Sequence, residues 1–78
     1  MNKYYNVIQL ILNDLEQQAK GVAHKTNKDY GEVLSNYVTQ TSKTEIEDKA
    51  EEVFGRKITR QERVILFNYA SDAGMLRR

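Results

Sequence analysis

The chain contains no cysteine among its 78 residues, so no disulfide can staple it and it must fold by burying apolar side chains. A chain of this length buries only about 60–65% of the surface that its unfolded form exposes, and a single core then gives marginal stability. Hydrophobic residues make up 40% of the sequence and charged residues 29%, as is ordinary for a globular domain. We therefore expect one domain that spans residues 1–78.

Apolar residues recur along the chain at helical spacing, and the alternation that is typical of strands is not sustained. Polar joints divide this pattern into segments that predict four helices, at about 3–23, 27–39, 44–54 and 60–73. The expected fold class is all-α, a small four-helix bundle. The joint between the last two helices, from Gly55 to Ile58, is short. It predicts a tight helix-turn-helix unit.

Capping residues mark the expected helix ends. Pairs with the capping-box spacing, in which an acidic residue follows a Ser or Thr by three positions, occur at Thr26–Asp29, Ser42–Glu45, Thr44–Glu47 and Thr59–Glu62. Gly55 and Gly74 follow the third and fourth helices. We expect both glycines in the left-handed conformation that ends a helix.

Two groups of residues lie off the main apolar faces. In the first helix, Val7 and Leu10 are off the stripe, which indicates either a central position in the bundle or contact with another chain. In the fourth helix, Ile65 and Leu66 belong to the apolar face, whereas a second face mixes apolar and basic groups. Surfaces of that kind are typical of interfaces. The residues that we predict to bind a partner are Val7, Leu10, Arg60, Arg63, Val64, Phe67 and Ser71.

The net charge of +1 is unevenly distributed, with net −4 over residues 44–55 and net +4 over residues 56–78. Four basic residues gather at the last joint and the start of the fourth helix: Arg56, Lys57, Arg60 and Arg63. The string from Ala50 to Val64 resembles a helix-turn-helix motif, although two of its gaps are one residue longer than in that motif. The resemblance implies that the fourth helix would meet the DNA major groove while nearby basic residues contact phosphates.

Residues with catalytic chemistry are scarce. His24 is the only histidine and has no second histidine, cysteine or carboxylate beside it, so we expect a surface residue rather than a general base. The acids of the third helix are expected to form a solvated face. No phosphate loop, nucleophile elbow, dinucleotide fingerprint or zinc spacing occurs. We therefore predict a non-enzymatic protein with no metal, no cofactor and no small-molecule substrate.

No apolar run approaches the roughly 20 residues that span a bilayer, and no export signal is evident. We therefore expect a cytoplasmic protein with no membrane contact. The main hypothesis is a small regulatory or inhibitory module that binds a larger protein, and a homodimer is also expected. Richness in Asn, Lys, Tyr and Ile is typical of AT-rich bacterial or phage genomes, where such lone domains often modulate host proteins. The alternative is a DNA-binding regulator that uses Arg56, Lys57, Arg60 and Arg63.

Overall fold

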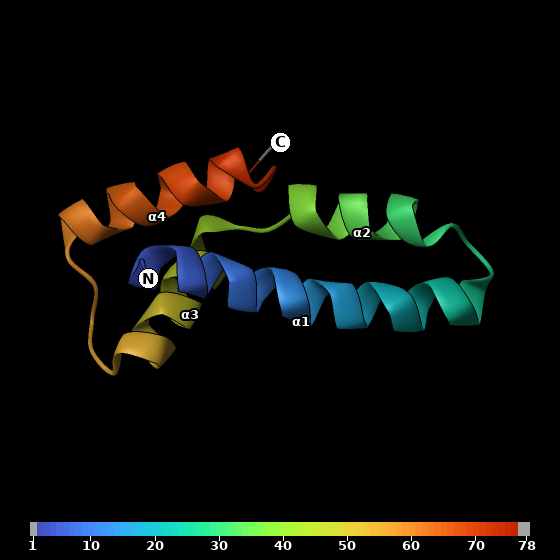
Figure 1. Cartoon of the computed structure of the whole chain (residues 1–78), viewed down its shortest axis with the longest axis horizontal. Coiled ribbons are helices and arrows are strands. Elements are labelled where there is room, and N and C mark those ends of the chain that lie inside the picture. Colours follow the sequence, from blue (N-terminus) through green and yellow to red (C-terminus); the bar gives the residue numbers. More distant parts are fainter. Residues whose placement is uncertain (1, 77–78) are drawn as a thin grey trace.

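The computed structural model describes residues 2–76 and contains four α-helices and no strand within that range (Figure 1). The helices are α1 (Lys3–Thr26), α2 (Tyr30–Thr39), α3 (Lys43–Phe54) and α4 (Arg60–Asp72). The all-α prediction is confirmed, and each predicted helix has a counterpart. In the described range no helix is long and apolar enough to cross a membrane.

Local capping chemistry determines most of the helix ends. Capping boxes are formed by Ser42 with Glu45 and by Thr59 with Glu62, each with both reciprocal hydrogen bonds. Gly55 ends α3 at a φ of 71°. Gly74 adopts a φ of 89°, and the backbone N–H of the following residue, Met75, donates to the carbonyl of Ala70 at 2.9 Å. This is a Schellman motif, which carries the buried Met75 side chain back into the core.

The first joint differs from the prediction. Helix α1 runs to Thr26 rather than ending at 23, and α2 begins at Tyr30 rather than at 27. Thr26 is therefore not the cap of α2, because its hydroxyl donates to the Val22 carbonyl within α1. Asn27 ends α1 in the left-handed conformation, which its short polar side chain tolerates. Asp29 is the N-cap of α2 and accepts from the Glu32 backbone N–H.

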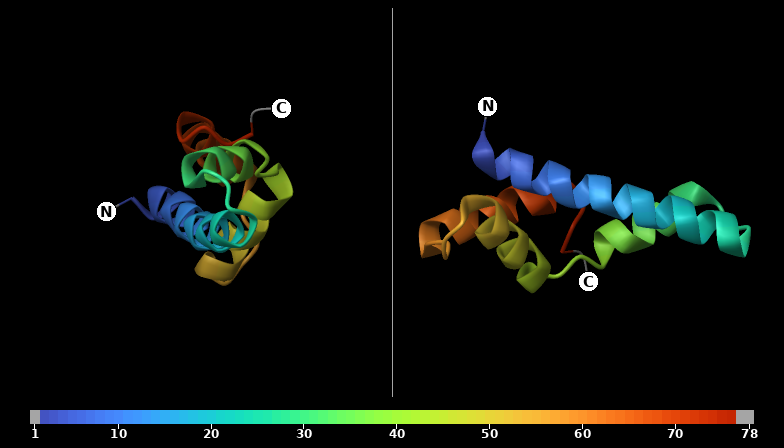
Figure 2. Two further views of the ribbon diagram at one scale, coloured as in Figure 1. Left: turned by 90° about the vertical axis from the view of Figure 1, so that its right-hand side faces the viewer. Right: turned by 90° about the horizontal axis from the view of Figure 1, so that it is seen from below.

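The 24-residue helix α1 is the spine of an elongated molecule that measures 41 × 23 × 22 Å. Helices α3 and α4 pack on the first half of α1 and on each other, while α2 folds back along its second half. Of the four helices in residues 2–76, only α1 packs on α2, although Val38 at the end of α2 also lies against the larger apolar cluster. Both side and end views place α2 and α4 on the same side of α1, with α3 on another side (Figures 1 and 2).

Two apolar clusters follow from this arrangement. The larger cluster lies between the first half of α1, α3 and α4, and the smaller one has only Ala19, Ala23 and Val33 as buried members. Of the two alternatives for Val7, the structure supports a central position in the bundle rather than contact with a partner. Its side chain is fully buried in the larger cluster. Two helices pack on this half of α1, so α1 needs a buried arc wider than one stripe.

The larger cluster predicts where the chain is most sensitive to substitution. Leu66 is 0% exposed. Leu66→Ala should cost about 2–5 kcal/mol, because it removes buried methyl groups and leaves a cavity. That loss is a large part of the roughly 5–15 kcal/mol that stabilises a small domain. We expect urea unfolding, followed by circular dichroism, to shift to a much lower midpoint. Val64→Ala, at a side chain 55% exposed, should leave the midpoint nearly unchanged. Equal midpoints for the two variants would contradict this core assignment.

Candidate functional site

A buried carboxylate lies where the start of α4 meets the first turn of α1. Glu62 is 7% exposed, and Arg56 donates to both of its oxygens at 2.8 Å. The Thr59 backbone N–H donates to Oε1 at 3.0 Å, and the Tyr4 hydroxyl donates to Oε2 at 3.3 Å. Lys3 Nζ lies 3.7 Å from Oε2. One carboxylate thus ties α1, the α3–α4 joint and α4 together.

These contacts favour the ionised form of the carboxyl group. The hydrogen bonds from Arg56, and after them the backbone bond from Thr59, hold the pKa of Glu62 far below its usual value of 4.5. Burial acts in the opposite direction and is outweighed. Phe54 lies against the same cluster, with Lys3 Nζ and the Arg56 guanidinium 5.2 and 5.6 Å from its ring centroid. The site therefore has the chemistry of a fold-stabilising ion cluster.

Two of the four residues predicted to contact DNA bind carboxylates of the chain itself. Arg56 is held by Glu62, and Arg63 Nε lies 3.0 Å from Glu47 Oε1, as an ion pair whose N–H is not aligned for a hydrogen bond. The second pair joins the acidic third helix to the basic fourth helix. Lys57 and Arg60 are exposed and have no acidic partner within residues 2–76. They leave a small basic surface at the joint.

The predicted partner-binding residues do not form one surface. Val64 is 55% exposed and Ser71 is exposed, both on the outer face of α4. Phe67 is half-buried against the core, and Lys43 Nζ lies 5.5 Å from its ring centroid. Leu10 is 42% exposed on α1, a different helix. The mixed face of α4 is therefore present, but Phe67 is only partly exposed on it.

A larger surface that the sequence analysis did not identify runs along the seam between α1 and α4 and continues to α2. Three adjoining hollows of about 280, 290 and 460 Å³ share Tyr69, Asp72 and Ala73 among their walls. Tyr5 is 47% exposed at this seam, and its ring lies 6.4 Å from that of Tyr69. Among residues 2–76, Asp72 is the only charged residue on the walls, although 29% of the chain is charged. We call this surface the uncharged groove.

The helical periodicity of the sequence did not predict the groove. Ile65 belongs to the apolar face of the fourth helix by its spacing, yet it is 36% exposed, on the wall of the groove. The apolar arc of α4 is wider than the part that α1 and α3 cover. The exposed Tyr5 was the available signal, because a large side chain at the margin of a stripe is where such an edge begins.

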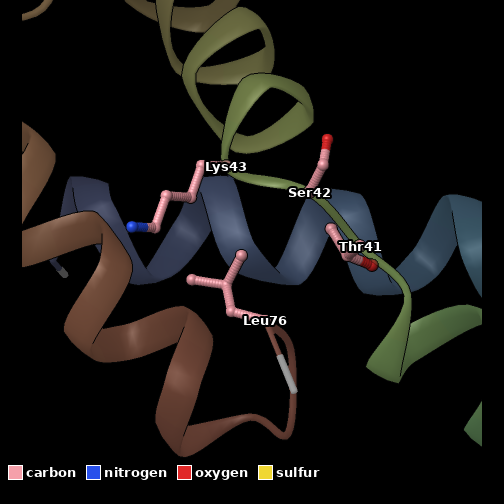
Figure 3. Close-up of a pocket in the computed structure, with 4 residues that line it drawn as sticks. All are labelled: Thr41, Ser42, Lys43 and Leu76. Carbon is pink, nitrogen blue, oxygen red and sulfur yellow. The ribbon is translucent and has the colours of Figure 1, made fainter. Parts of the chain in front are cut away.

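A further hollow of about 320 Å³ lies beside the joint between α2 and α3 (Figure 3). Its walls are Thr41, Ser42, Lys43 and Leu76. The Thr41 hydroxyl donates to the Tyr37 carbonyl, and the Ser42 hydroxyl oxygen accepts from the Glu45 backbone N–H. The two hydroxyl groups of this hollow therefore form hydrogen bonds with the local backbone.

His24 is exposed in the last turn of α1. Within residues 2–76, no three side chains of the His, Cys, Asp or Glu type come together as metal ligands would.

The ion cluster predicts how stability depends on pH. The pKa of Glu62 is lower in the folded state than in the unfolded state, so the charged carboxylate stabilises the fold above about pH 4.5. That contribution is lost as the pH falls through the range below. Glu62→Gln should therefore melt at a lower temperature than the wild type at about pH 6, and the difference should shrink towards about pH 3. Circular dichroism melting curves measure both. A difference that stays constant over this range would contradict the assigned role of the charge.

The chain was compared with protein-family models, curated proteins and solved structures. No family model matches, and neither a curated protein nor a solved structure is similar to it. Function is therefore inferred from the side chains described above.

Proposed function

We propose that this chain is a non-enzymatic regulatory or inhibitory module that binds a helix of a larger protein in the uncharged groove. The observation that carries the proposal is the scarcity of charge on the groove walls, where Asp72 alone is charged among the residues that the structure describes. Interface centres are depleted in charged residues and enriched in aromatic ones. Tyr5 and Tyr69 give the groove two aromatic rings, and each ring combines apolar area with a polar tip.

The spacing of the wall residues supports a helical occupant. From α1, the walls include Tyr5, Ile8 and Leu12, and from α4 they include Ile65 and Tyr69. Within each helix these residues are three or four positions apart, so they form ridges along the helix surface. Helices pack when the ridges of one enter the grooves of another. A third helix laid along the α1–α4 seam would meet two such ridges at once.

We expect Asp72 to determine which helices bind in the groove. It is exposed in the last turn of α4 and has no ion-pair partner within residues 2–76. A negative side chain at a helix C-terminus is itself unfavourable, because the helix dipole is negative there. A lysine or arginine on the bound helix would relieve this repulsion. We therefore expect the partner helix to have an apolar face with one basic residue beside it.

The test is a selection of helical peptides from a displayed random library of about 18 residues, a length that forms a rod of about 27 Å. We expect binders with apolar residues three or four positions apart and a basic residue at one edge. Asp72→Lys should weaken the best peptide at least tenfold in a fluorescence anisotropy titration, because it places two positive charges together. Replacing the basic residue of the peptide by Glu should restore binding to that variant.

Val64→Lys is the matched control, since Val64 is exposed on α4 but is not on the groove walls. It should leave peptide affinity unchanged. Loss of binding in Val64→Lys together with normal binding in Asp72→Lys would move the interface to the mixed face of α4 and overturn the groove. Failure to select any binder with an apolar face would overturn the helical occupant.

DNA binding is the second candidate, and one observation favours it. Lys57 and Arg60 are exposed beside the N-terminus of a 13-residue helix and have no acidic partner in the described range. Against it, the two other cations of the set, Arg56 and Arg63, are held by carboxylates. Phosphates would have to compete with those carboxylates for them.

A labelled random DNA duplex measures this candidate directly. If only Lys57 and Arg60 contact phosphates, the logarithm of the binding constant should fall with a slope of about −2 against the logarithm of salt concentration. At physiological salt, two such contacts should leave binding weaker than the typical range of about 10⁻⁴–10⁻⁶ M for nonspecific DNA binding. Micromolar affinity with a slope near −4 would mean that all four cations reach the DNA. That result would favour the regulator over the protein-binding module.

A further inference from the structure

The second half of α1 and the whole of α2 form an arm that is only two helices thick. In the described range α1 is the only helix that packs on α2, and the buried members of their cluster are Ala19, Ala23 and Val33. The larger side chains at this seam, which include Val22 and Tyr37, are only partly buried. Two-helix units with small buried residues bury little apolar area, so such an arm gains stability when a further helical layer covers it.

One flank of the arm has a hollow of about 260 Å³. Val22, Val33 and Tyr37 are its apolar walls, and Lys28 and Glu32 are its charged walls. This hollow lies on the opposite flank of α2 from the uncharged groove, whose α2 walls include Leu34 and Val38. Residues 33 and 37 differ from residues 34 and 38 by one position, or about 100° around the helix. The hollow is thus a separate surface from the proposed partner site.

The described walls of this hollow have one positively charged and one negatively charged side chain. Lys28 and Glu32 are both exposed, and neither forms an ion pair within residues 2–76. A surface with one cation, one anion and an apolar floor is complementary to itself under a twofold rotation. In a twofold dimer each contact occurs twice with the roles exchanged. Lys28 of each copy would then meet Glu32 of the other.

We propose that two copies of this chain associate through this hollow, with the two arms packed as a four-helix layer. The apolar floors of the two copies would cover each other, and the two Lys28–Glu32 pairs would determine their relative orientation. The net charge of the whole chain is only +1, so long-range repulsion between copies is weak. The proposed dimer leaves the uncharged groove of each copy open, and it stands independently of the groove's occupant.

The test is analytical ultracentrifugation of the full chain over a range of concentrations, with charge variants of the hollow. The wild type should show the mass of two chains at the upper end of the range. Lys28→Glu and Glu32→Lys should each shift the dissociation constant at least tenfold towards the monomer, because each variant brings like charges together. An equimolar mixture of the two variants should recover the dimer, since every cross-pair is then a cation with an anion.

Asp48→Lys is the matched control, because it makes the same charge change as Glu32→Lys at an exposed position of α3. It should dimerise like the wild type. Circular dichroism is used to check that each variant is folded. Lys28 lies in the joint between α1 and α2, so Lys28→Glu changes no helical residue. A monomeric wild type would overturn the proposal. So would single variants that dimerise normally, or a mixture that stays monomeric. Peptide binding to the groove by a monomeric wild type would overturn the dimer and leave the proposed function intact.

Discussion

The packing of α4 against the first half of α1 depends on one carboxylate. Glu62 completes the capping box of α4, accepts both arms of the Arg56 guanidinium and receives the Tyr4 hydroxyl of α1. A side chain that serves only as a cap could be exposed and replaceable. Here it is buried, so every one of its lone pairs must be satisfied by a particular neighbour. The cluster therefore limits the angle at which α4 leaves the joint and the position of α4 against α1.

That angle determines what remains uncovered. Helix α4 lies along the first half of α1, and α2 lies along the second half on the same side (Figures 1 and 2). On the side away from α3, the seam between α1 and α4 has no third helix over it in the described range, and its walls there consist of the margins of both helices. Both the groove and the arm follow from a spine of 24 residues that is longer than any of the helices packed on it.

Local signals predicted much of this fold, and tertiary packing decided the rest. The caps at Ser42 and Thr59 and the glycine at Gly55 depend on residues within one turn, so the sequence pattern located them correctly. At the first joint, the Thr26 hydroxyl can either cap α2 or donate to the Val22 carbonyl, and residue spacing alone does not decide between the two. Burial of Val7 depends on two helices far along the chain, and exposure of Ile65 depends on how much of α4 those contacts leave open. The groove was not predictable for the same reason.

The distribution of charged side chains connects the fold to the proposed function. The acidic and basic stretches are joined by the ion pair between Glu47 and Arg63, and within the basic stretch Glu62 pairs with Arg56. Cations used in this way hold helices together and are poorly placed to attract a polyanion. Of the hollows on the surface, the groove has one acid among its described walls, and the hollow on the other flank of α2 has one charge of each sign. Small, balanced charges of this kind add little long-range attraction, but they select orientation at short range. These surfaces are the basis of the proposals that the chain binds a partner helix and a second copy of itself.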